Sequence, residues 1–353
     1  MHLKKLSLKN FRIYDELSLE FNHRPTVLLG KNAAGKSSVL EAVYLLSTTK
    51  SIRVESESEL VKEKEAVCRI EGIVEDGDDE TNLLITFSKE DDLATFFQKK
   101  TVLNGVSKRV IDFLGNLPAV LFSPSDINMV TGSPSLRRWH MDLGLAQINK
   151  TYKRALTQYE QFLVSRNRLL KRIKDGESRI DELEYWNDEL VGNGEIVAGV
   201  RREFFEFINK LEKPLGNFDF IYKESILSKN RLQEYLSREI ASGTTLIGPH
   251  RDDYLMNLYG KSLSQFGSRG EQRTGTLALK LSLLEYMAEK TGKRPILLLD
   301  DVFSELDADH RKYVVEIVSK QQTIIATVEL ENIPQEFLDS SNILQVEEGN
   351  INL

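Results

Sequence analysis

A glycine-rich segment at residues 30–37 has the residue types and spacing to bind phosphate: Gly30-Lys31-Asn32-Ala33-Ala34-Gly35-Lys36-Ser37. It fits the pattern G-x-x-x-x-G-K-[ST], in which glycines let the backbone fold closely around phosphate oxygens and the N–H groups of a helix N-terminus supply positive potential. We expect Lys36 to neutralise the β- and γ-phosphates, Ser37 to ligate Mg²⁺, and the nucleotide-binding residues to extend to Ser38. The alternative is a glycine-rich helix start without a ligand. An apolar run before the segment and a helical pattern after it favour the nucleotide site.

Two adjacent acids follow an apolar run near the other end of the chain, in Ile296-Leu297-Leu298-Leu299-Asp300-Asp301. Phosphoryl transfer depends mostly on positioning and charge neutralisation, and carboxylates at a strand end supply both. We therefore expect Asp300 to lie near Mg²⁺ and Asp301 to be the base that positions the attacking water. Alone, this pattern is also typical of a buried strand that runs into an acidic turn. Together with the phosphate-binding segment it predicts an ATPase, with Lys36, Asp300 and Asp301 as its catalytic residues.

A third motif, Gly267-Ser268-Arg269-Gly270-Glu271-Gln272, precedes a long helical pattern and resembles the ABC signature S-x-G-E/Q-Q. Its physical logic is a second anion cradle made by Ser268, Gly270 and the helix N-terminus. In ABC proteins this cradle closes on the γ-phosphate held by the opposite subunit. Residues 304–307 (SELD) resemble the D-loop that crosses the same interface. Each short motif alone is equally typical of a capped helix start, but the four occur in the order that ABC ATPases have.

Several further segments resemble the RecF family of ABC/SMC-type ATPases, and together they span nearly the whole chain. The matching segments are residues 8–14 (LKNFRIY), 122–126 (FSPSD), 132–138 (GSPSLRR) and 248–253 (GPHRDD). The sequence departs from the family pattern at Ala33-Ala34, at Phe266-Gly267, at Arg269, and at Thr327, where ABC transporters have a switch histidine. RecF-type heads also lack that histidine, so slow hydrolysis is expected.

The resemblance implies ATP and Mg²⁺ as cofactors and an α/β fold: an ABC-type P-loop ATPase head, with a mixed sheet and an antiparallel lobe, and an inserted helical arm. It implies that residues 30–38 bind ATP, that Ser268 and Gly270 act across a homodimer, and that Arg53, within Ser51-Ile52-Arg53, lies near phosphate or DNA. Asp126 would lie in the Q-loop equivalent, near Mg²⁺. The role of His250 stays open.

The activity implied by the same resemblance is a weak, DNA-stimulated ATPase that clamps double-stranded DNA at gaps or single-strand/double-strand junctions. It would act with RecR and RecO to load RecA, and hydrolysis would release the clamp. Three alternatives fit the sequence less well. A transporter ATPase subunit has no long helical arm, a scaffold that only binds ATP does not need Asp301, and a larger SMC-like protein has a far longer arm.

The element pattern explains how distant motifs meet. Strand-like alternation marks residues 1–29, and residues 66–121 alternate in short stretches broken by Asp76-Gly77 and Asn104-Gly105, typical of hairpins. Residues 144–213 show apolar residues at helical spacing, which predicts a long amphipathic helix followed by breaks near Asp175-Gly176 and Gly192-Asn193-Gly194. We therefore expect a head formed by residues 1–143 and 217–353, with an arm at 144–216 inserted between its halves.

Charge is unevenly distributed along this chain of 353 residues, whose formal net charge is −7. Residues 150–174 carry about +7, from eight basic side chains and one acid, whereas residues 55–92 carry about −10. The basic segment is a candidate DNA surface, although a charge run is as often a solvated helix face. No apolar run approaches a membrane span and the single cysteine, Cys68, cannot form an internal disulfide, so a cytoplasmic protein is expected.

Overall fold

The structure is a computed structural model that describes residues 1–54, 56–89 and 97–352 of the chain. Its contacts divide the chain into two compact units. The first unit comprises Met1–Asp126, Lys213–Gly216 and Arg269–Leu353, and the second comprises Ile127–Glu212 and Asn217–Ser268. The arm expected at 144–216 is thus only part of a larger second unit, which also contains α4 (Pro134–Ile148) and strands β9 (Phe218–Lys223) and β10 (Asp253–Leu258).

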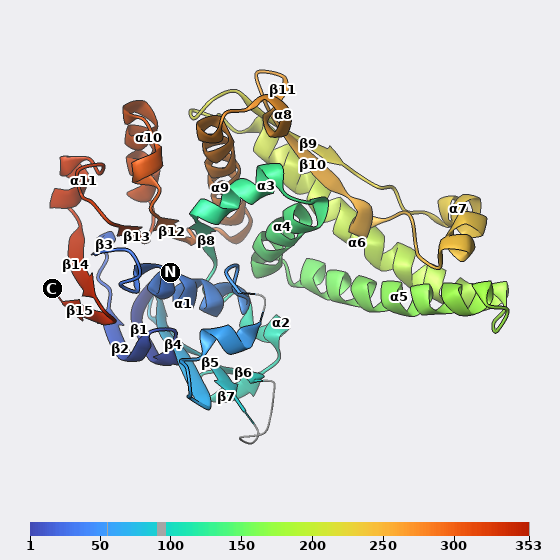
Figure 1. Cartoon of the computed structure of the whole chain (residues 1–353), viewed down its shortest axis with the longest axis horizontal. Helices are drawn as coiled ribbons and strands as arrows, with labels where there is room; N and C mark the ends of the chain where they lie inside the picture. The colour runs from blue at the N-terminus through green and yellow to red at the C-terminus, as the bar shows by residue number, and fades with distance from the viewer. Residues whose placement is uncertain (55, 90–96, 353) are drawn as a thin grey trace. The chain divides into compact units, whose positions relative to one another are not determined.

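A six-stranded sheet carries the nucleotide motifs of the first unit, with β14, β3, β13, β12 and β8 parallel and β15 antiparallel at one edge (Figure 1). In sheet order the strands are β15 (Asn350–Asn352), β14 (Asn342–Glu347), β3 (Thr26–Leu29), β13 (Thr323–Thr327), β12 (Ile296–Asp300) and β8 (Ala119–Phe122). Strands β8, β12 and β13 are buried along their whole length, which explains their continuous apolar runs.

An antiparallel sheet forms the other layer of the first unit. Its strands, in sheet order, are β2 (Tyr14–Glu20), β1 (His2–Phe11), β4 (Val67–Asp76), β5 (Asp79–Ser88), β6 (Gln98–Leu103) and β7 (Val106–Lys108). The expected hairpins are confirmed, since Asp76 pairs with Asp79 and Leu103 with Val106. Both turns need a left-handed glycine, and Gly77 and Gly105 have φ values of 66° and 77°.

Helix α1 (Lys36–Thr48) packs against both sheets, and its residues from Val39 to Thr48 are all buried. Apolar side chains of α1 and of the two sheets form one continuous core, so the helix that follows the phosphate-binding segment is fixed from both sides. The remaining helical segments of this unit are η1 (Glu57–Leu60), α2 (Val110–Phe113), η2 (Pro124–Ile127, which ends in the second unit), α9 (Arg269–Thr291), η5 (Phe303–Glu305), α10 (Ala308–Val318) and α11 (Gln335–Asp339).

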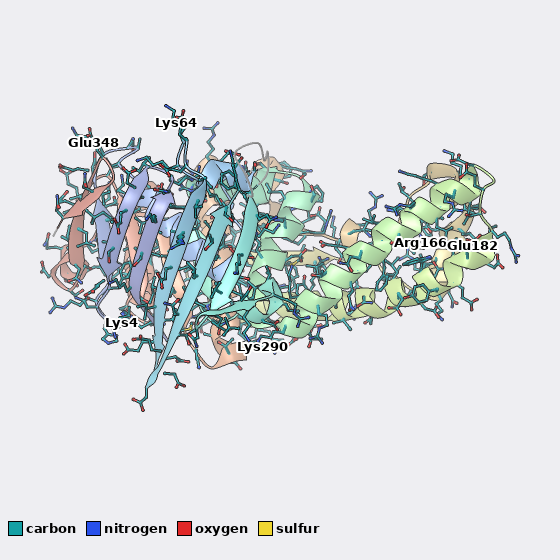
Figure 2. The ribbon with its side chains drawn as sticks, turned by 90° about the horizontal axis from the view of Figure 1, so that it is seen from below. Lys4, Lys64, Arg166, Glu182, Lys290 and Glu348 are labelled. Atoms are coloured by element: carbon teal, nitrogen blue, oxygen red, sulfur yellow. The ribbon has the colours of Figure 1, made fainter. Side chains whose placement is uncertain are left out.

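In the second unit, α5 (Lys150–Lys174) and α6 (Leu183–Lys210) run side by side, as Figure 2 shows. The prediction of a single helix from residue 144 is wrong in one detail. Helix α4 ends at Ile148, and α5 begins after Asn149, whose side chain accepts the backbone N–H of Tyr152 at 2.8 Å and so caps α5. The break expected at residues 192–194 is also wrong. Helix α6 continues through it, and a Cβ built at Gly194 would lie 2.7 Å from the Leu227 side chain, so this glycine permits close packing.

The rest of the second unit surrounds this helix pair. Its other elements are α3 (Asn128–Thr131), η3 (Ile180–Glu182), α7 (Lys229–Ser242), η4 (Pro249–Arg251), α8 (Leu263–Phe266), and a three-stranded antiparallel sheet of β11 (Lys261–Ser262), β10 (Asp253–Leu258) and β9 (Phe218–Lys223). Helix α7 packs on both α5 and α6. Within the described residues, no helix is both long and apolar enough to cross a membrane.

Candidate nucleotide site

The carboxyl ends of three neighbouring parallel strands meet at one edge of the first unit's parallel sheet. Asp300 at the end of β12 lies beside Ala326 of β13, and Thr327 of β13 lies beside Leu29 at the end of β3. The phosphate-binding segment follows β3, so it reaches the same edge. A cavity of about 990 Å³ opens there, large enough for a nucleotide. Of the expected nucleotide-binding residues, those that line it are Asn32, Ala33, Ala34, Gly35, Lys36, Ser37, Ser38 and Arg53, together with the two expected acids Asp300 and Asp301.

Ser37 and Asp300, which are 263 positions apart in the chain, meet inside this cavity. The Ser37 hydroxyl donates a hydrogen bond to a carboxylate oxygen of Asp300 at 2.8 Å. The hydroxyl of Ser37 and the carboxylate of Asp300 are oxygen ligands of the kind that Mg²⁺ prefers. Mg²⁺ is commonly bound by one or two protein groups together with substrate phosphates. No group of three His, Cys, Asp or Glu side chains that could hold a metal ion occurs among the described residues. The donor set therefore fits Mg²⁺ bound together with a nucleotide.

Lys36 lies at the N-terminus of α1 with its ammonium group turned toward the loop backbone. It donates hydrogen bonds to the carbonyl oxygens of Gly30, at 2.7 Å, and Lys31, at 2.8 Å. Burial lowers the pKa of Lys36, while the nearby carboxylates of Asp300 and Asp301 act in the opposite direction. The ammonium is thus a largely buried cation whose present partners are neutral carbonyls, which a phosphate anion would replace favourably.

The loop backbone needs its glycines where other chain segments approach. A Cβ at Gly30 would lie 2.2 Å from the carbonyl oxygen of Val346, and one at Gly35 would lie 2.5 Å from the Tyr14 hydroxyl, where φ is also +112°. Ala33, one of the departures from the family pattern, has φ of 65°. An alanine in this left-handed region costs about 1–2 kcal/mol relative to an ordinary backbone conformation. The phosphate-binding loop therefore contains one residue, Ala33, in a strained backbone conformation.

The two acids at the end of β12 occupy different environments. The Asp300 side chain is buried, and burial raises its pKa, against the opposing effects of Arg53 and Ser37. Asp301 lines the cavity in a left-handed conformation, φ 52°, and its N–H donates to the carbonyl of Ala326 at 2.9 Å. Asp300 is thus held in a fixed orientation, whereas Asp301 presents its carboxylate to the cavity.

Arg53 forms an ion pair with Asp300, so this residue, expected near phosphate, lies within the site. Its backbone N–H donates to the Ser51 hydroxyl at 2.9 Å, and that hydroxyl donates to Glu41 at 2.5 Å. Arg12 donates two hydrogen bonds of 2.9 Å to Glu41, one to each carboxylate oxygen. Sequence reasoning missed Glu41, although a single acid inside the apolar run of α1 was a usable signal.

Asp126 was expected near Mg²⁺, but it does not line the cavity. Its side chain is 0% exposed, and its carboxylate accepts the N–H of Ser123 at 2.7 Å and pairs with Lys280 of α9 at 3.1 Å. The neighbouring residues Ser123 and Ser125 line the cavity instead. Asp126 thus ties the turn after β8 to α9 and gives this part of the wall its shape.

The signature segment lies at the start of α9, where the two compact units divide. Ser268 is the last residue of the second unit, and Arg269 and Gly270 are the first residues of the next part of the first. All three are exposed, and Gly270 does not line the cavity of its own chain. In the SELD segment, Asp307 caps α10 by accepting the N–H of His310 at 2.9 Å.

One of the basic residues expected to face DNA is not on the surface. Arg166, labelled in Figure 2, is 0% exposed and forms an ion pair at 2.7 Å with Glu239 of α7, which is also 0% exposed. Asn187 and Thr245 accept its other N–H groups at 2.7 Å each. The expectation for Arg166 is corrected accordingly: it joins α5 to α7 inside the unit.

The other basic residues of α5 form an exposed stripe. Arg154, Arg168 and Arg172 are spaced by close to whole numbers of helical turns, so they lie on one face of α5. Lys150 and Lys171 lie on or next to the same face. All five are exposed, and none forms an ion pair with a described residue. We call Lys150, Arg154, Arg168, Lys171 and Arg172 the basic stripe. In the first unit, by contrast, Arg12 pairs with Glu41, Arg53 with Asp300 and Lys4 with Glu80.

The segments 132–138 and 248–253 meet each other within the second unit. Arg137 forms a bidentate pair with Asp253, at 2.7 and 2.9 Å, and Asp252 accepts a hydrogen bond from the buried Arg201 at 2.8 Å. His250 lies between the hydroxyl of Tyr159, at 2.6 Å, and the carbonyl of Thr245, at 3.0 Å. Burial lowers the pKa of His250 to about 4, so it is a neutral structural residue at physiological pH.

Comparison with known proteins gives full-length matches. The family described as RecF/RecN/SMC N terminal domain matches residues 2–350. A protein called DNA replication and repair protein RecF from Oceanobacillus iheyensis is 34% identical over 376 residues, covering 100% of both chains. A protein of the same name from Halalkalibacterium halodurans is 34% identical over 377 residues, covering 99% of both.

Two kinds of solved structure are similar to the chain. A structure described as the recombination mediator protein RecF with ATP, in the RecFOR pathway, has a TM-score of 0.87 and 31% identity and covers 99% of this chain and 97% of its own. An Smc head domain from Pyrococcus furiosus, with a TM-score of 0.54 and 18% identity, covers 99% of this chain and 95% of its own. The second match shows a shared ABC-type head fold and no more.

Proposed function

Because this chain belongs to the RecF family of DNA replication and repair proteins, we propose that it is an ATP-dependent clamp on double-stranded DNA. The observation that carries the proposal is the hydrogen bond between Ser37 and Asp300, 2.8 Å long, in a cavity that also holds Lys36. It joins the phosphate-binding loop to the end of β12 as an ATP site requires. A similar RecF structure is described with ATP, which supports ATP as the nucleotide.

In this proposal, each side chain of the cavity has one task. Lys36 exchanges its two carbonyl partners for phosphate oxygens, and backbone N–H groups of residues 32–37 hold the rest of the polyphosphate. Ser37 and Asp300 hold Mg²⁺, which when bound neutralises the charge of the β- and γ-phosphate oxygens. Asp301 orients the attacking water. Hydrolysis is slow, because Thr327 rather than a histidine stands at the end of β13.

We further propose that ATP joins two copies of the chain. Ser268, Gly270 and the N-terminus of α9 would bind the γ-phosphate held by the partner copy. The exposure of Ser268, Arg269 and Gly270 supports the idea, because the backbone N–H groups at a helix N-terminus supply positive potential for an anion. Phe266, two residues before Ser268, is 72% exposed and would be covered by the partner. The D-loop-like segment 304–307 would cross the same interface.

The DNA surface in this proposal is the basic stripe of α5. Its five positive charges span about 27–33 Å along the helix, a length over which duplex DNA presents many phosphates. Few residues there can read base edges, so binding is expected to be largely independent of sequence. Two copies joined by ATP would double the stripe, which makes DNA binding ATP-dependent. As in the RecF family, the expected site of action is gapped or junction DNA in the cytoplasm, with RecR and RecO as partners in loading RecA.

The experiment measures duplex DNA binding against salt concentration, with saturating ATP and Mg²⁺. The tested variant replaces Arg154, Arg168, Lys171 and Arg172 with Gln. Because each neutralised phosphate contributes a salt slope of about −0.9, we expect the variant to bind more weakly and to lose roughly 3–4 units of slope per arm. We also expect Lys36→Ala to abolish ATP-dependent DNA binding.

The matched control replaces Lys100, Lys108, Lys312 and Lys320 with Gln, which removes the same charge from exposed positions outside the second unit. It should leave the slope near that of the parent. An unchanged slope in the stripe variant, with a reduced slope in the control, would place the DNA surface on the head instead.

A further inference from the structure

The ion pair between Arg53 and Asp300 occupies an oxygen of the site's proposed metal-binding carboxylate. Asp300 has two carboxylate oxygens, one of which accepts the Ser37 hydroxyl at 2.8 Å, while the other pairs with the Arg53 guanidinium. The Asp300 side chain is only 7% exposed, so water reaches it poorly. Each oxygen of this buried carboxylate already has one partner, so a metal ion bound directly at Asp300 would compete with Arg53.

Electrostatics explain why Arg53 takes this position. Burial of the Asp300 carboxylate disfavours its charged form, and Arg53 is the strongest of the groups that act against this effect. An unpaired buried carboxylate costs several kcal/mol, and a nearby guanidinium offsets much of that cost. Arg53 therefore supplies the positive charge that the buried Asp300 carboxylate requires.

The backbone of Arg53 is also linked to Glu41 of α1. The Ser51 hydroxyl accepts the Arg53 backbone N–H at 2.9 Å and donates to Glu41 at 2.5 Å. Arg12 contacts both carboxylate oxygens of Glu41 and donates to the carbonyl of Glu59 at 3.0 Å. Except for Ser51, the residues of this chain of contacts line the cavity, and all belong to the first unit. The position of Arg53 is thus coupled to the segment that carries Ser51 and, through Glu41, to α1.

We propose that Arg53 is an exchangeable counter-ion of Asp300, which holds the carboxylate neutralised until metal and nucleotide bind and then yields its place. The inference rests on the proposed ATP site and adds a positioning role for Arg53 within it. Arg53 would leave Asp300 when a metal ion supplies the positive charge there, while the Ser51 hydroxyl keeps its hydrogen bond to the Arg53 backbone. Arg53 therefore sets how strongly ATP affinity depends on Mg²⁺.

A simpler role, direct binding of phosphate by Arg53, predicts a different result. A phosphate-binding arginine contributes to ATP affinity whether or not Mg²⁺ is present. A counter-ion of Asp300 contributes to ATP affinity mainly in the absence of Mg²⁺. Without it, the negative charge of the Asp300 carboxylate would repel the polyphosphate. The quantity that separates the two roles is the ratio of the ATP dissociation constant in EDTA to that in Mg²⁺.

The experiment measures this ratio by calorimetry for the parent and for Arg53→Gln. We expect Arg53→Gln to bind ATP about tenfold more weakly in EDTA, since a charge-assisted interaction is lost, and equally or more tightly in Mg²⁺. The ratio should therefore rise by about tenfold or more. Arg53→Lys keeps the positive charge and should restore a ratio close to that of the parent. Ser51→Ala removes the anchor without changing charge and should raise the ratio to a smaller extent.

The control is Arg24→Gln, which removes an exposed arginine of the same unit that does not line the cavity. It should leave the ratio unchanged. An unchanged ratio in Arg53→Gln, with ATP binding weakened equally in both conditions, would overturn the counter-ion role and leave the ATP site intact. If the parent binds no ATP in either condition, the proposed function fails and this inference fails with it. Ser51→Ala provides the same comparison if Arg53→Gln does not fold.

Discussion

At the scale of single residues, the adjacent carboxylates of Asp300 and Asp301 have different surroundings, which suit them to different roles. Asp300 is buried, bonded to Ser37 and paired with Arg53, and burial raises its pKa. Asp301, the next residue, lines the cavity in a left-handed conformation. Neighbouring carboxyl groups in different surroundings commonly take different tasks. Asp300 is suited to hold a cation at a fixed place, and Asp301 is suited to orient a water.

This division leads to a prediction for Asp301→Asn. The amide keeps the size of the side chain but cannot accept a proton, so ATP binding should persist while hydrolysis falls by about 10²–10⁴-fold. Phosphate release in steady state and ATP affinity by calorimetry measure the two effects separately. Lys36→Ala is the contrasting variant, and it should lose ATP binding itself. Hydrolysis by Asp301→Asn at the parental rate would exclude Asp301 as the base.

At the scale of elements, local patterns predicted what depends on local geometry. The hairpins at Asp76-Gly77 and Asn104-Gly105, and the buried strands β12 and β13, form as expected because turn chemistry and apolar runs fix them. The phosphate-binding segment was predictable because the spacing of its glycines, Lys36 and Ser37 forms one short motif, although the structure shows that Gly30 and Gly35 are also required by the close approach of Val346 and Tyr14. The expected ABC-type α/β head fold is confirmed by the matches to RecF and SMC-head structures.

Features that depend on distant partners could not be predicted from the sequence. The continuous α6 at Gly194 depends on close packing against the Leu227 side chain. Charge counting placed Arg166 on a DNA surface, whereas its partner Glu239 lies 73 positions away in the chain. Lys280 likewise holds Asp126 away from the cavity that the family pattern suggested.

The buried pair of Arg166 and Glu239 gives a prediction at this scale. Removing one partner leaves an uncompensated buried charge, so Arg166→Met should lower the unfolding free energy of the second unit by about 3–5 kcal/mol. Denaturant unfolding followed by far-UV circular dichroism measures this. The double variant Arg166→Met with Glu239→Leu should recover much of the loss. A loss below about 1 kcal/mol in Arg166→Met would show that the pair is not closed in solution.

At the scale of the whole molecule, the chain returns to its first unit after forming the second. Residues from both ends of the chain line the proposed ATP site, and the second unit carries the basic stripe on α5. The signature segment at residues 267–272 lies where the chain passes from the second unit back to the first, and residues 268–271 within it are exposed at the start of α9. An exposed anion cradle that does not serve its own cavity is best explained by a nucleotide held in another copy. The central claim is therefore that ATP joins two chains.

The most direct measurement is the molar mass in solution, by light scattering or sedimentation, with and without ATP and Mg²⁺. The chain has a mass of 40.3 kDa, and the account predicts that ATP doubles this value, whereas its absence leaves monomers. Ser268→Arg should fill the signature cradle, so that monomers still bind ATP by calorimetry but do not dimerise. A mass that stays at one chain under saturating ATP, or dimers formed equally by the parent and Ser268→Arg, would contradict the proposed role of the signature across the dimer.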